Sequence, residues 1–337
     1  MNKVKYQIPR KISRGFSLVE LMVAMVIGLL VLAAAGGIFL TNRRTYTATE
    51  NLSRLQENAR FAFELMSRDI REASGNACNS GRGMAMVNVL NDPATRWWSD
   101  WQNGAIRGFG AGEAFPDSAF GTGAGQRLAG TEALALVSGG NRTALVTGHN
   151  PGGTEFTVSN AAHGFTPGDI LIACGPNSEV TGVLRLGAIF QMTGVAGSTA
   201  IRHDGGGGSP GNATGNLGLD NSEFTFAPNT TISDLHAVRW YIANNGRGGR
   251  SLYQGVLTGN GVVQNQEVVD NVQSMALEYL VPSAGGYLGP AAVAGRWGEV
   301  SALRISLQQS SQDRVSTDNQ ALQRTVASVV TLRNRNP

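Results

Sequence analysis

Apolar residues dominate the first part of the chain. From Leu21 to Leu40, twenty residues pass without a charge, which is enough helix to cross a bilayer core of about 30 Å. Basic residues precede this run with no acid among them: Lys3, Lys5, Arg10, Lys11 and Arg14. Because positive flanks stay cytoplasmic, we expect a membrane-spanning helix over residues 16–40, with everything after it outside the inner membrane.

Apolar residues spaced three and four apart continue the helix beyond the membrane. They predict an amphipathic second half over residues 41–75, whose apolar stripe packs on the rest of the protein. The stripe consists of Leu52, Leu55, Ala59, Ala62, Phe63, Met66, Ile70 and Ala73. No proline interrupts Phe16 to Ser74, and Gly75 suits a C-cap. We therefore expect one helix of roughly 85–90 Å.

Residues 76–337 show a different pattern, with short apolar alternations separated by Gly, Ser, Thr and Asn. Glycine accounts for 45 of 337 residues, about twice its usual share of roughly 7%, which indicates many turns. Strands are expected near residues 132–137, 154–158, 169–174, 183–193, 223–226, 236–243, 252–256, 274–281, 299–308 and 324–332. Residues 91–131 predict a long loop held by aromatic side chains. The predicted fold class is α+β, with the long helix packed on an antiparallel β-sheet head.

One acid stands at the start of the apolar run. A carboxylate in hydrocarbon costs roughly 2.5–3.5 kcal/mol at a helix centre and less near the interface, so Glu20 is expected to be functional and to have a partner. The sequence around it, residues 15–20, reads GFSLVE. A secretory signal peptide cleaved at Ala33–Ala35, or a plain membrane anchor, would also fit the hydropathy. Neither alternative accounts for this hexapeptide.

The hexapeptide resembles the processing site of type IV prepilins. The resemblance implies that residues 1–15 are a leader peptide, that prepilin peptidase cuts between Gly15 and Phe16, and that Phe16 is then N-methylated. It also implies a partner for Glu20, because in pilin filaments this glutamate is thought to meet the α-amino group of a neighbouring subunit, here that of Phe16. A subunit out of register would leave both charges unpaired at low dielectric. Glu20 is therefore expected to guide subunit addition.

The net charge of the chain depends on this processing. The whole sequence carries +3 and has a pI near 9.1, which could indicate a nucleic-acid partner. Removal of the five basic leader residues from the total of 27 leaves 22 arginines against 24 acids, a net charge of −2. A broad electrostatic affinity for DNA is therefore not supported, although a local arginine cluster stays open.

Two cysteines are present, Cys78 directly after the helix and Cys174 at the end of an expected strand. Thiols on the outer side of the inner membrane tend to be oxidised. A Cys78–Cys174 disulfide would close a loop of about 95 residues and contribute ~4–5 kcal/mol in the chain-entropy model. Two independent buried thiols are the alternative.

The rest of the sequence offers little chemistry. The histidines are scattered without metal-ligand spacing, so they are interpreted as turn or surface residues. They are His149, His163, His203 and His236. Trp97, Trp98 and Trp101 lie within five residues of one another and either anchor their loop or form a surface contact with a neighbour or ligand. We expect no enzymatic activity, no cofactor and no metal.

The chain as a whole resembles the PilW-type minor pilins of type IV pili, relatives of the larger minor pseudopilins of type II secretion. Matching stretches are QENARFAFELMSRDIREAS, the cysteine after it, GDILIAC, VQSMALEYL, VSALRISL and VVTLRNR. The resemblance implies a structural protein of the bacterial inner membrane and then of the extracellular pilus. Its partners would be other minor pilins and the major pilin, in a priming complex at or near the tip. A secretion-system pseudopilin and a tip-displayed adhesin or DNA-binding head are the alternatives.

Two positions bear on assembly. Pilin helices often carry a proline near the outer membrane boundary, where this chain has Gly37. A mid-helix glycine costs ~1 kcal/mol, so Gly36–Gly37 forms either a hinge on assembly or a site of close helix packing. Glu20 is retained, whereas the pseudopilin thought to cap the type II tip lacks its counterpart. An outermost position is therefore not expected.

Overall fold

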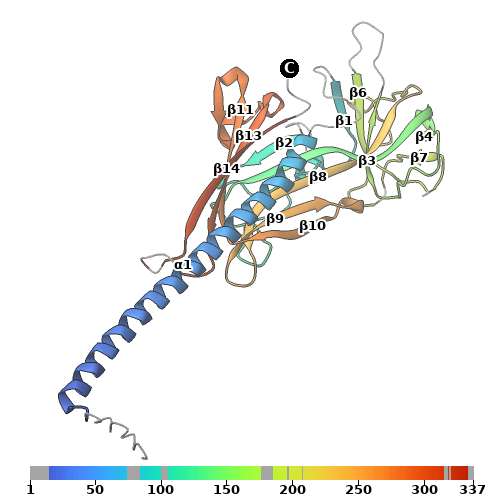
Figure 1. Ribbon diagram of the computed structural model, residues 1–337. Helices are drawn as coiled ribbons and strands as arrows, with labels where there is room; N and C mark the ends of the chain where they lie inside the picture. Colours follow the sequence, from blue (N-terminus) through green and yellow to red (C-terminus); the bar gives the residue numbers. More distant parts are fainter. Residues whose placement is uncertain are drawn as a thin grey trace, which may run out of the picture.

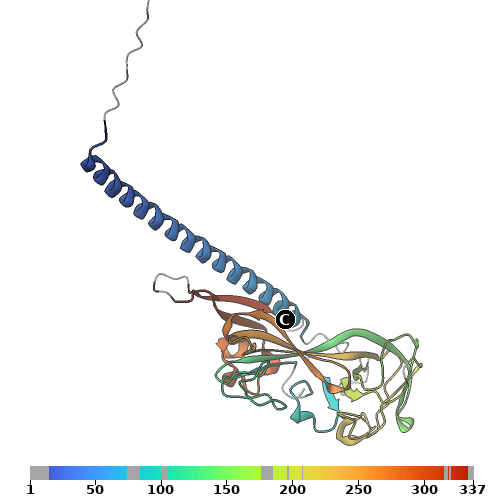
Figure 2. The ribbon, with the colours of Figure 1, turned by 90° about the horizontal axis from the view of Figure 1, so that it is seen from below.

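A long helix and two β-sheets make up the protein (Figure 1). The computed structural model describes residues 15–73, 84–99, 105–175, 185–195, 197–206, 208–314, 318 and 320–332. Helix α1, Leu18–Glu72, projects far beyond the head, and its C-terminal part lies against the sheets (Figures 1 and 2). The predicted α+β class is thereby confirmed.

A reciprocal cap starts α1. Ser17 is extended and accepts a hydrogen bond from the Glu20 N–H, while the N–H of Ser17 donates to the Glu20 carboxylate. The helix then runs for 55 residues, roughly 80 Å, without a break at Gly36–Gly37. It ends two residues short of the predicted point, with Ala73 as C-cap. Gly75 lies outside the described residues.

The larger sheet contains ten strands within the described part of the chain. Its main path is β1-β6-β5-β8-β3-β4-β7; in addition β2 pairs with β3, β9 with β8, and β10 with β9. The strands are β1 (Met84–Asn88), β2 (Ile106–Phe109), β3 (Ala133–Asn150), β4 (Glu155–Val158), β5 (Ile170–Cys174), β6 (Arg185–Gln191), β7 (Ala200–Arg202), β8 (Thr231–Asn244), β9 (Arg250–Leu257) and β10 (Val263–Asp270). All pairs are antiparallel except β1 with β6.

The smaller sheet is antiparallel, with the order β12-β11-β13-β14. Its strands are β11 (Val272–Val281), β12 (Gly286–Leu288), β13 (Ala302–Ser310) and β14 (Gln323–Thr331). A four-residue helix α2, Pro290–Val293, lies between β12 and β13 in the chain. The single predicted antiparallel sheet is therefore two sheets, one of them with a parallel pair.

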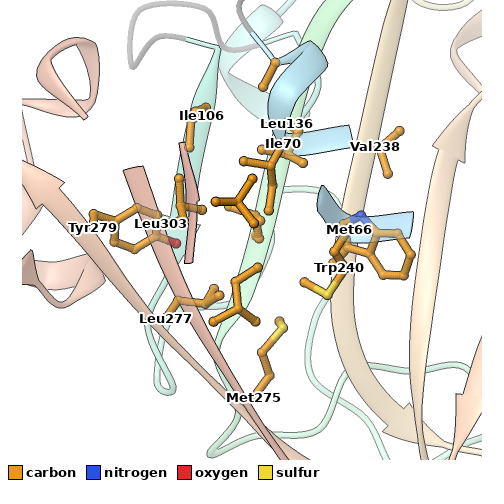
Figure 3. Packing of buried hydrophobic residues seen from close by; sticks show 14 of the residues in the cluster. Met66, Ile70, Ile106, Leu136, Val238, Trp240, Met275, Leu277, Tyr279 and Leu303 are labelled. Carbon is orange, nitrogen blue, oxygen red and sulfur yellow. The ribbon is translucent and has the colours of Figure 1, made fainter. Parts of the chain in front are cut away.

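The central core joins α1 to both sheets (Figure 3). Met66 and Ile70 of α1 lie close to Trp240 of β8, and the same cluster includes Leu277 and Leu303 of the smaller sheet. Most of the predicted stripe is buried: Leu55, Ala59, Ala62, Met66, Ile70 and Ala73. The exceptions are Phe63, which is half-buried, and Leu52, which is 39% exposed. The amphipathic prediction is thus confirmed for the part of α1 that meets the head.

Most predicted strands form, but with different bounds. Strands β3 and β8 extend well beyond the predicted 132–137 and 236–243. Residues 223–226 form no strand. Strand β10 was not predicted, because its sequence VQNQEVVD lies at the sheet edge and shows little apolar alternation. The described part of residues 91–131 contains β2 but is otherwise largely irregular, as predicted.

Candidate assembly site

Glu20 lies at the free end of α1. Its Oε2 accepts the Ser17 N–H at 3.1 Å, and the Ser17 Oγ accepts the Glu20 N–H at 3.2 Å. Both hydrogen bonds are exposed. Among the described residues, the carboxylate therefore contacts its own helix start, where the N-terminal end of the helix dipole also favours a negative charge. It is free to exchange this contact for a stronger one.

The helix around Glu20 exposes a long apolar surface. Leu21 is 50% exposed, Leu30 is 65% and Phe39 is 66%. This is the one described helix long and apolar enough to cross a membrane, and its most apolar window has no residue buried in the protein. An exposed apolar surface of this extent requires lipid or other helices around it.

The predicted cleavage and methylation positions precede the helix. Gly15 and Phe16 are in exposed, non-helical chain, and Phe16 is 80% exposed. Residues 10–36 match the sequence family described as "Prokaryotic N-terminal methylation motif". The chain carries a pilin-type signal. No curated protein matches the chain.

This motif characterises the type IV pilin and pseudopilin superfamily, whose proteins are processed by prepilin peptidase and assemble with other pilins. Proteins of this class are generally structural and not enzymes. The motif and the apolar N-terminal helix together indicate an inner-membrane prepilin of a pilus or secretion filament. The match covers Gly15, Phe16 and Glu20, the three residues singled out in the sequence.

A buried acid attaches α1 to the larger sheet. Asp69 is 4% exposed and accepts hydrogen bonds from Trp240 Nε1 at 3.0 Å and from Gln254 Nε2 at 2.8 Å. Burial raises the pKa of the Asp69 carboxyl, and the two donors act in the opposite direction. Sequence reasoning missed this residue. The feature that could have identified Asp69 is an acidic residue within the apolar stripe of the helix, one position before Ile70.

A polar cleft of about 490 Å³ lies where α1 enters the head. Asn51 donates to Asp313 at 3.1 Å, and Asn58 donates to Asp270 at 3.2 Å, so amides of α1 bridge to acids of the head. Arg54 is also in the cleft and pairs with Glu50 at 2.8 Å. These contacts fix the angle at which the helix leaves the head.

Two of the three clustered tryptophans, Trp97 and Trp98, are buried. Trp97 is 2% exposed and Trp98 is 1% exposed, and both belong to a buried cluster with Phe109 and Phe115. They anchor their loop, the first of the two interpretations, because their large apolar surface is removed from water. The surface interpretation is wrong for these two residues. Trp101 lies outside the described residues.

One of the two cysteines of the predicted disulfide lies among the described residues. Cys174 ends β5 and is 3% exposed. Cys78 lies outside the described residues. The Cys78–Cys174 bridge therefore stays a prediction.

Two histidines that are far apart in sequence meet in the structure. Their Nε2 atoms, in His149 and His203, are 3.1 Å apart, and His203 is fully buried. The interpretation as turn or surface residues is wrong for the buried His203 and for His149 and His236, which are half-buried in β3 and β8. His163 lies in a bend, as expected, but is buried. Burial lowers the pKa of His149 and of His203 to about 4. Strand pairing of β3, β4 and β7 creates this contact, which no sequence spacing could show.

The histidine pair is a hydrogen bond and not a metal centre. The backbone N–H of Phe226 donates to Nδ1 of His149 at 3.1 Å, so the proton of the neutral His149 ring is on Nε2 and points to His203. A protonated ring nitrogen cannot ligate a metal. Among the described residues, no group of three or more His, Cys, Asp or Glu side chains is arranged for a metal ion.

Proposed function

We propose that this chain is a PilW-type minor pilin that takes part in initiating type IV pilus assembly, as part of a minor-pilin complex at or near the tip. In this proposal prepilin peptidase removes residues 1–15 and Phe16 is methylated. Residues 16–40 span the membrane and pack with other subunits, while residues 41–75 carry the head of residues 76–337. Other minor pilins and the major pilin are the partners.

The position of Glu20 carries the proposal. In the isolated chain its carboxylate accepts a neutral N–H from Ser17. After cleavage, the α-amino group of Phe16 on a neighbouring subunit would offer a full positive charge to the same carboxylate. Charge-assisted hydrogen bonds are roughly twice as strong as neutral ones, so assembly would replace a weak cap with a strong pair. The exposed chain at Gly15–Phe16 supports access by the peptidase.

The breadth of the head supports a minor and not a repeating subunit. The larger sheet extends far to one side of α1 (Figures 1 and 2). Subunits that pack helix against helix along a filament must all fit their heads around a common helical centre. A broad head is accommodated more easily at an end, where it has neighbours on one side. A disulfide between Cys78 and Cys174 would strengthen the attachment of this head to α1.

The proposal is tested in a deletion strain complemented with the wild-type chain or with Glu20→Leu. We expect the deletion to reduce surface pili strongly, and Glu20→Leu to fail to restore them although the chain accumulates in the inner membrane. Mass spectrometry of sheared filaments should identify a peptide that begins at N-methyl-Phe16. The matched control is Glu64→Leu, which removes an exposed acid of the same helix.

Three results would contradict the proposal. They are normal pili in the deletion strain, full restoration by Glu20→Leu, and a native N-terminus after Ala35 or still within residues 1–15. Secretion that fails in the deletion strain while pili stay normal would instead identify a pseudopilin of a secretion system.

A further inference from the structure

The face of the larger sheet opposite α1 carries a pocket. Along β8, Val238, Trp240 and Ile242 belong to the core under α1, whereas Arg239 and Tyr241 point to the opposite face, because strand residues alternate between the two sides. On that opposite face, the irregular segment 110–131 and strands β8 to β10 enclose a pocket of about 370 Å³. This volume is within the range of small-molecule sites.

The pocket combines buried cations with aromatic walls. Arg127 and Arg239 line it together with the rings of Phe115, Tyr241 and Tyr253. The described residues that line the pocket include no Asp or Glu. The polar side chains at the more exposed positions include Gln126 and Asn265. Asp117 pairs with Arg239 at 3.3 Å but does not line the pocket, so the lining itself presents cations and favours an anion.

Arg127 is a buried cation without a carboxylate on its guanidinium. It is 2% exposed, and its terminal nitrogens donate to the backbone oxygens of Glu113, Gly110 and Thr131 at 2.6–2.9 Å. Its Nε has no hydrogen-bond partner among the described residues. Burial lowers the pKa of Arg127 to about 10, so the side chain stays charged at neutral pH. The carbonyl groups hold the guanidinium in place, and the charges of Glu113 and Glu132 act on it from a distance without a hydrogen bond among the described residues.

Arg239 is the cation that can contact a ligand directly. Its guanidinium carbon lies 4.7 Å from the ring centre of Phe115 and 5.4 Å from that of Tyr241. Rings that cover the guanidinium leave hydrogen bonding to the plane of its five N–H donors. Two bonds use this plane, to Asp117 at 3.3 Å and to Asn265 at 3.1 Å, and Nε has no partner among the described residues. Because Nε is buried, the donors that remain for a further acceptor are the second N–H groups of Nη1 and Nη2.

We propose that this pocket binds a hexuronate, a pyranose sugar that carries a carboxylate. The carboxylate is bound by the in-plane N–H groups of Arg239 and attracted by the charge of Arg127. The apolar face of the pyranose ring packs on Tyr253, and the hydroxyl groups bond to Gln126 and Asn265. Aromatic walls in place of further cations favour a sugar acid over inorganic phosphate. The pocket is on the sheet face opposite α1, so helix packing in a filament leaves it open.

The test is binding of sodium galacturonate to the purified full chain in detergent, measured by calorimetry and by thermal unfolding at constant ionic strength. Galactose provides the ring without the charge, and sodium acetate provides the charge without the ring. We expect galacturonate to bind and to raise Tm, because a ligand that binds only the folded state stabilises it. Galactose and acetate should each bind at least about tenfold more weakly, the loss expected for one missing charged or stacking contact.

Two variants locate the site. Ala124→Trp introduces a bulky group at an exposed position of the pocket rim and should weaken galacturonate binding by about tenfold or more. Asn265→Ala removes a rim amide and should also weaken binding. The control is Arg304→Gln on the smaller sheet, an arginine that also stacks on a ring, Tyr287, and pairs with Glu278; it should leave the affinity unchanged.

The proposal is overturned if galacturonate does not bind the wild-type chain at millimolar concentration. It is also overturned if acetate binds as well as galacturonate, since the pocket would then recognise only charge. Equal effects of Ala124→Trp and Arg304→Gln would move the site elsewhere and overturn it as well. Each readout is independent of pilus assembly, so failure here leaves the proposed function unaffected.

Discussion

The indole N–H of Trp240 donates to the carboxylate of Asp69 at 3.0 Å, which joins β8 to α1 inside the protein. Gln254 of β9 donates to the same oxygen at 2.8 Å. One carboxylate thus fixes the helix to two adjacent strands. Because all force on the head passes through α1, this contact sets how firmly the head follows the helix.

Asp69→Ala should destabilise the head by about 2–4 kcal/mol, because the buried donors of Trp240 and Gln254 lose their acceptor. Asp69→Asn should cost less, since an amide oxygen can still accept both hydrogen bonds. Thermal unfolding of the full chain, followed by tryptophan fluorescence, measures both effects. Glu64→Ala, at an exposed position on the same helix, is the control. Equal Tm values for Asp69→Ala and this control would contradict the prediction.

The same acid predicts a pH dependence. Burial raises the folded-state pKa of Asp69 above 3.8, so between 3.8 and that higher value the folded chain binds more protons than the unfolded chain. The contribution of Asp69 to stability is therefore greatest at low pH and declines as pH rises through this window. The stability of the wild type relative to Asp69→Asn should fall as pH rises from 4 toward neutrality. An unchanged difference would show that Asp69 does not titrate abnormally.

The buried stripe of α1 predicts that substitutions at two positions of this helix differ in their effect on stability. Met66 is fully buried beside Trp240 (Figure 3), whereas Phe61 is 49% exposed. Met66→Ala should cost about 2–5 kcal/mol of unfolding free energy, since it removes buried apolar surface and leaves a cavity. Phe61→Ala should stay within about 0.5 kcal/mol. Urea unfolding of both variants measures this difference in unfolding free energy. A larger loss of stability for Phe61→Ala than for Met66→Ala would show that α1 is rotated relative to the head.

The helix was predictable because its signals are local. A capping sequence at Ser17, an uninterrupted apolar run and a stripe at three-and-four spacing all act within a few residues. Strand β3 was not predictable in full, because its last two thirds read GGNRTALVTGHN and are held as a strand by pairing with β8 and β4. Strand order and the division into two sheets depend on such distant pairings.

The same distinction applies to the functional residues. Glu20 could be predicted because a lone acid in an apolar run is anomalous by itself. Arg127 could not, since the groups that hold it are backbone carbonyls, which have no sequence signature. Trp97 and Trp98 were ambiguous because a cluster of aromatic residues is equally suited to a core and to a surface. Only their burial decided between the two.

The histidine pair predicts a loss of stability in acid. For both His149 and His203 the folded-state pKa is lowered from 6.5 to about 4, so below pH 6.5 the unfolded chain binds protons that the folded chain resists. Stability is complete above pH 6.5 and is lost as pH falls toward 4. For buried His203 the shift corresponds to about 3 kcal/mol, and the partly exposed His149 contributes less because water screens its charge.

Protonation would also place two N–H groups opposite each other where His149 now donates to His203. His203→Leu should therefore flatten the dependence of Tm on pH between 6.5 and 4, even if it lowers Tm at neutral pH. Asp204, which acts in the opposite direction on the His203 pKa, is retained in this variant. His236→Gln is the matched control. An equal acid sensitivity of wild type and His203→Leu would rule out the pair as its cause.

The continuity of α1 through Gly36–Gly37 leads to a prediction about assembly. A Cβ at either glycine would meet no atom within 4 Å, so alanine fits at both positions. Each Gly→Ala change should stabilise the helix by about 1 kcal/mol, and amide exchange around residues 33–41 should slow, with no change in the Tm of the head.

If local unwinding at the glycines is a step of assembly, the double variant Gly36→Ala/Gly37→Ala should produce fewer pili than wild type. Gly28→Ala, which also meets no atom within 4 Å, is the control for a general stiffening of the helix. Normal piliation with slower exchange would exclude unwinding and assign the two glycines to close packing between helices.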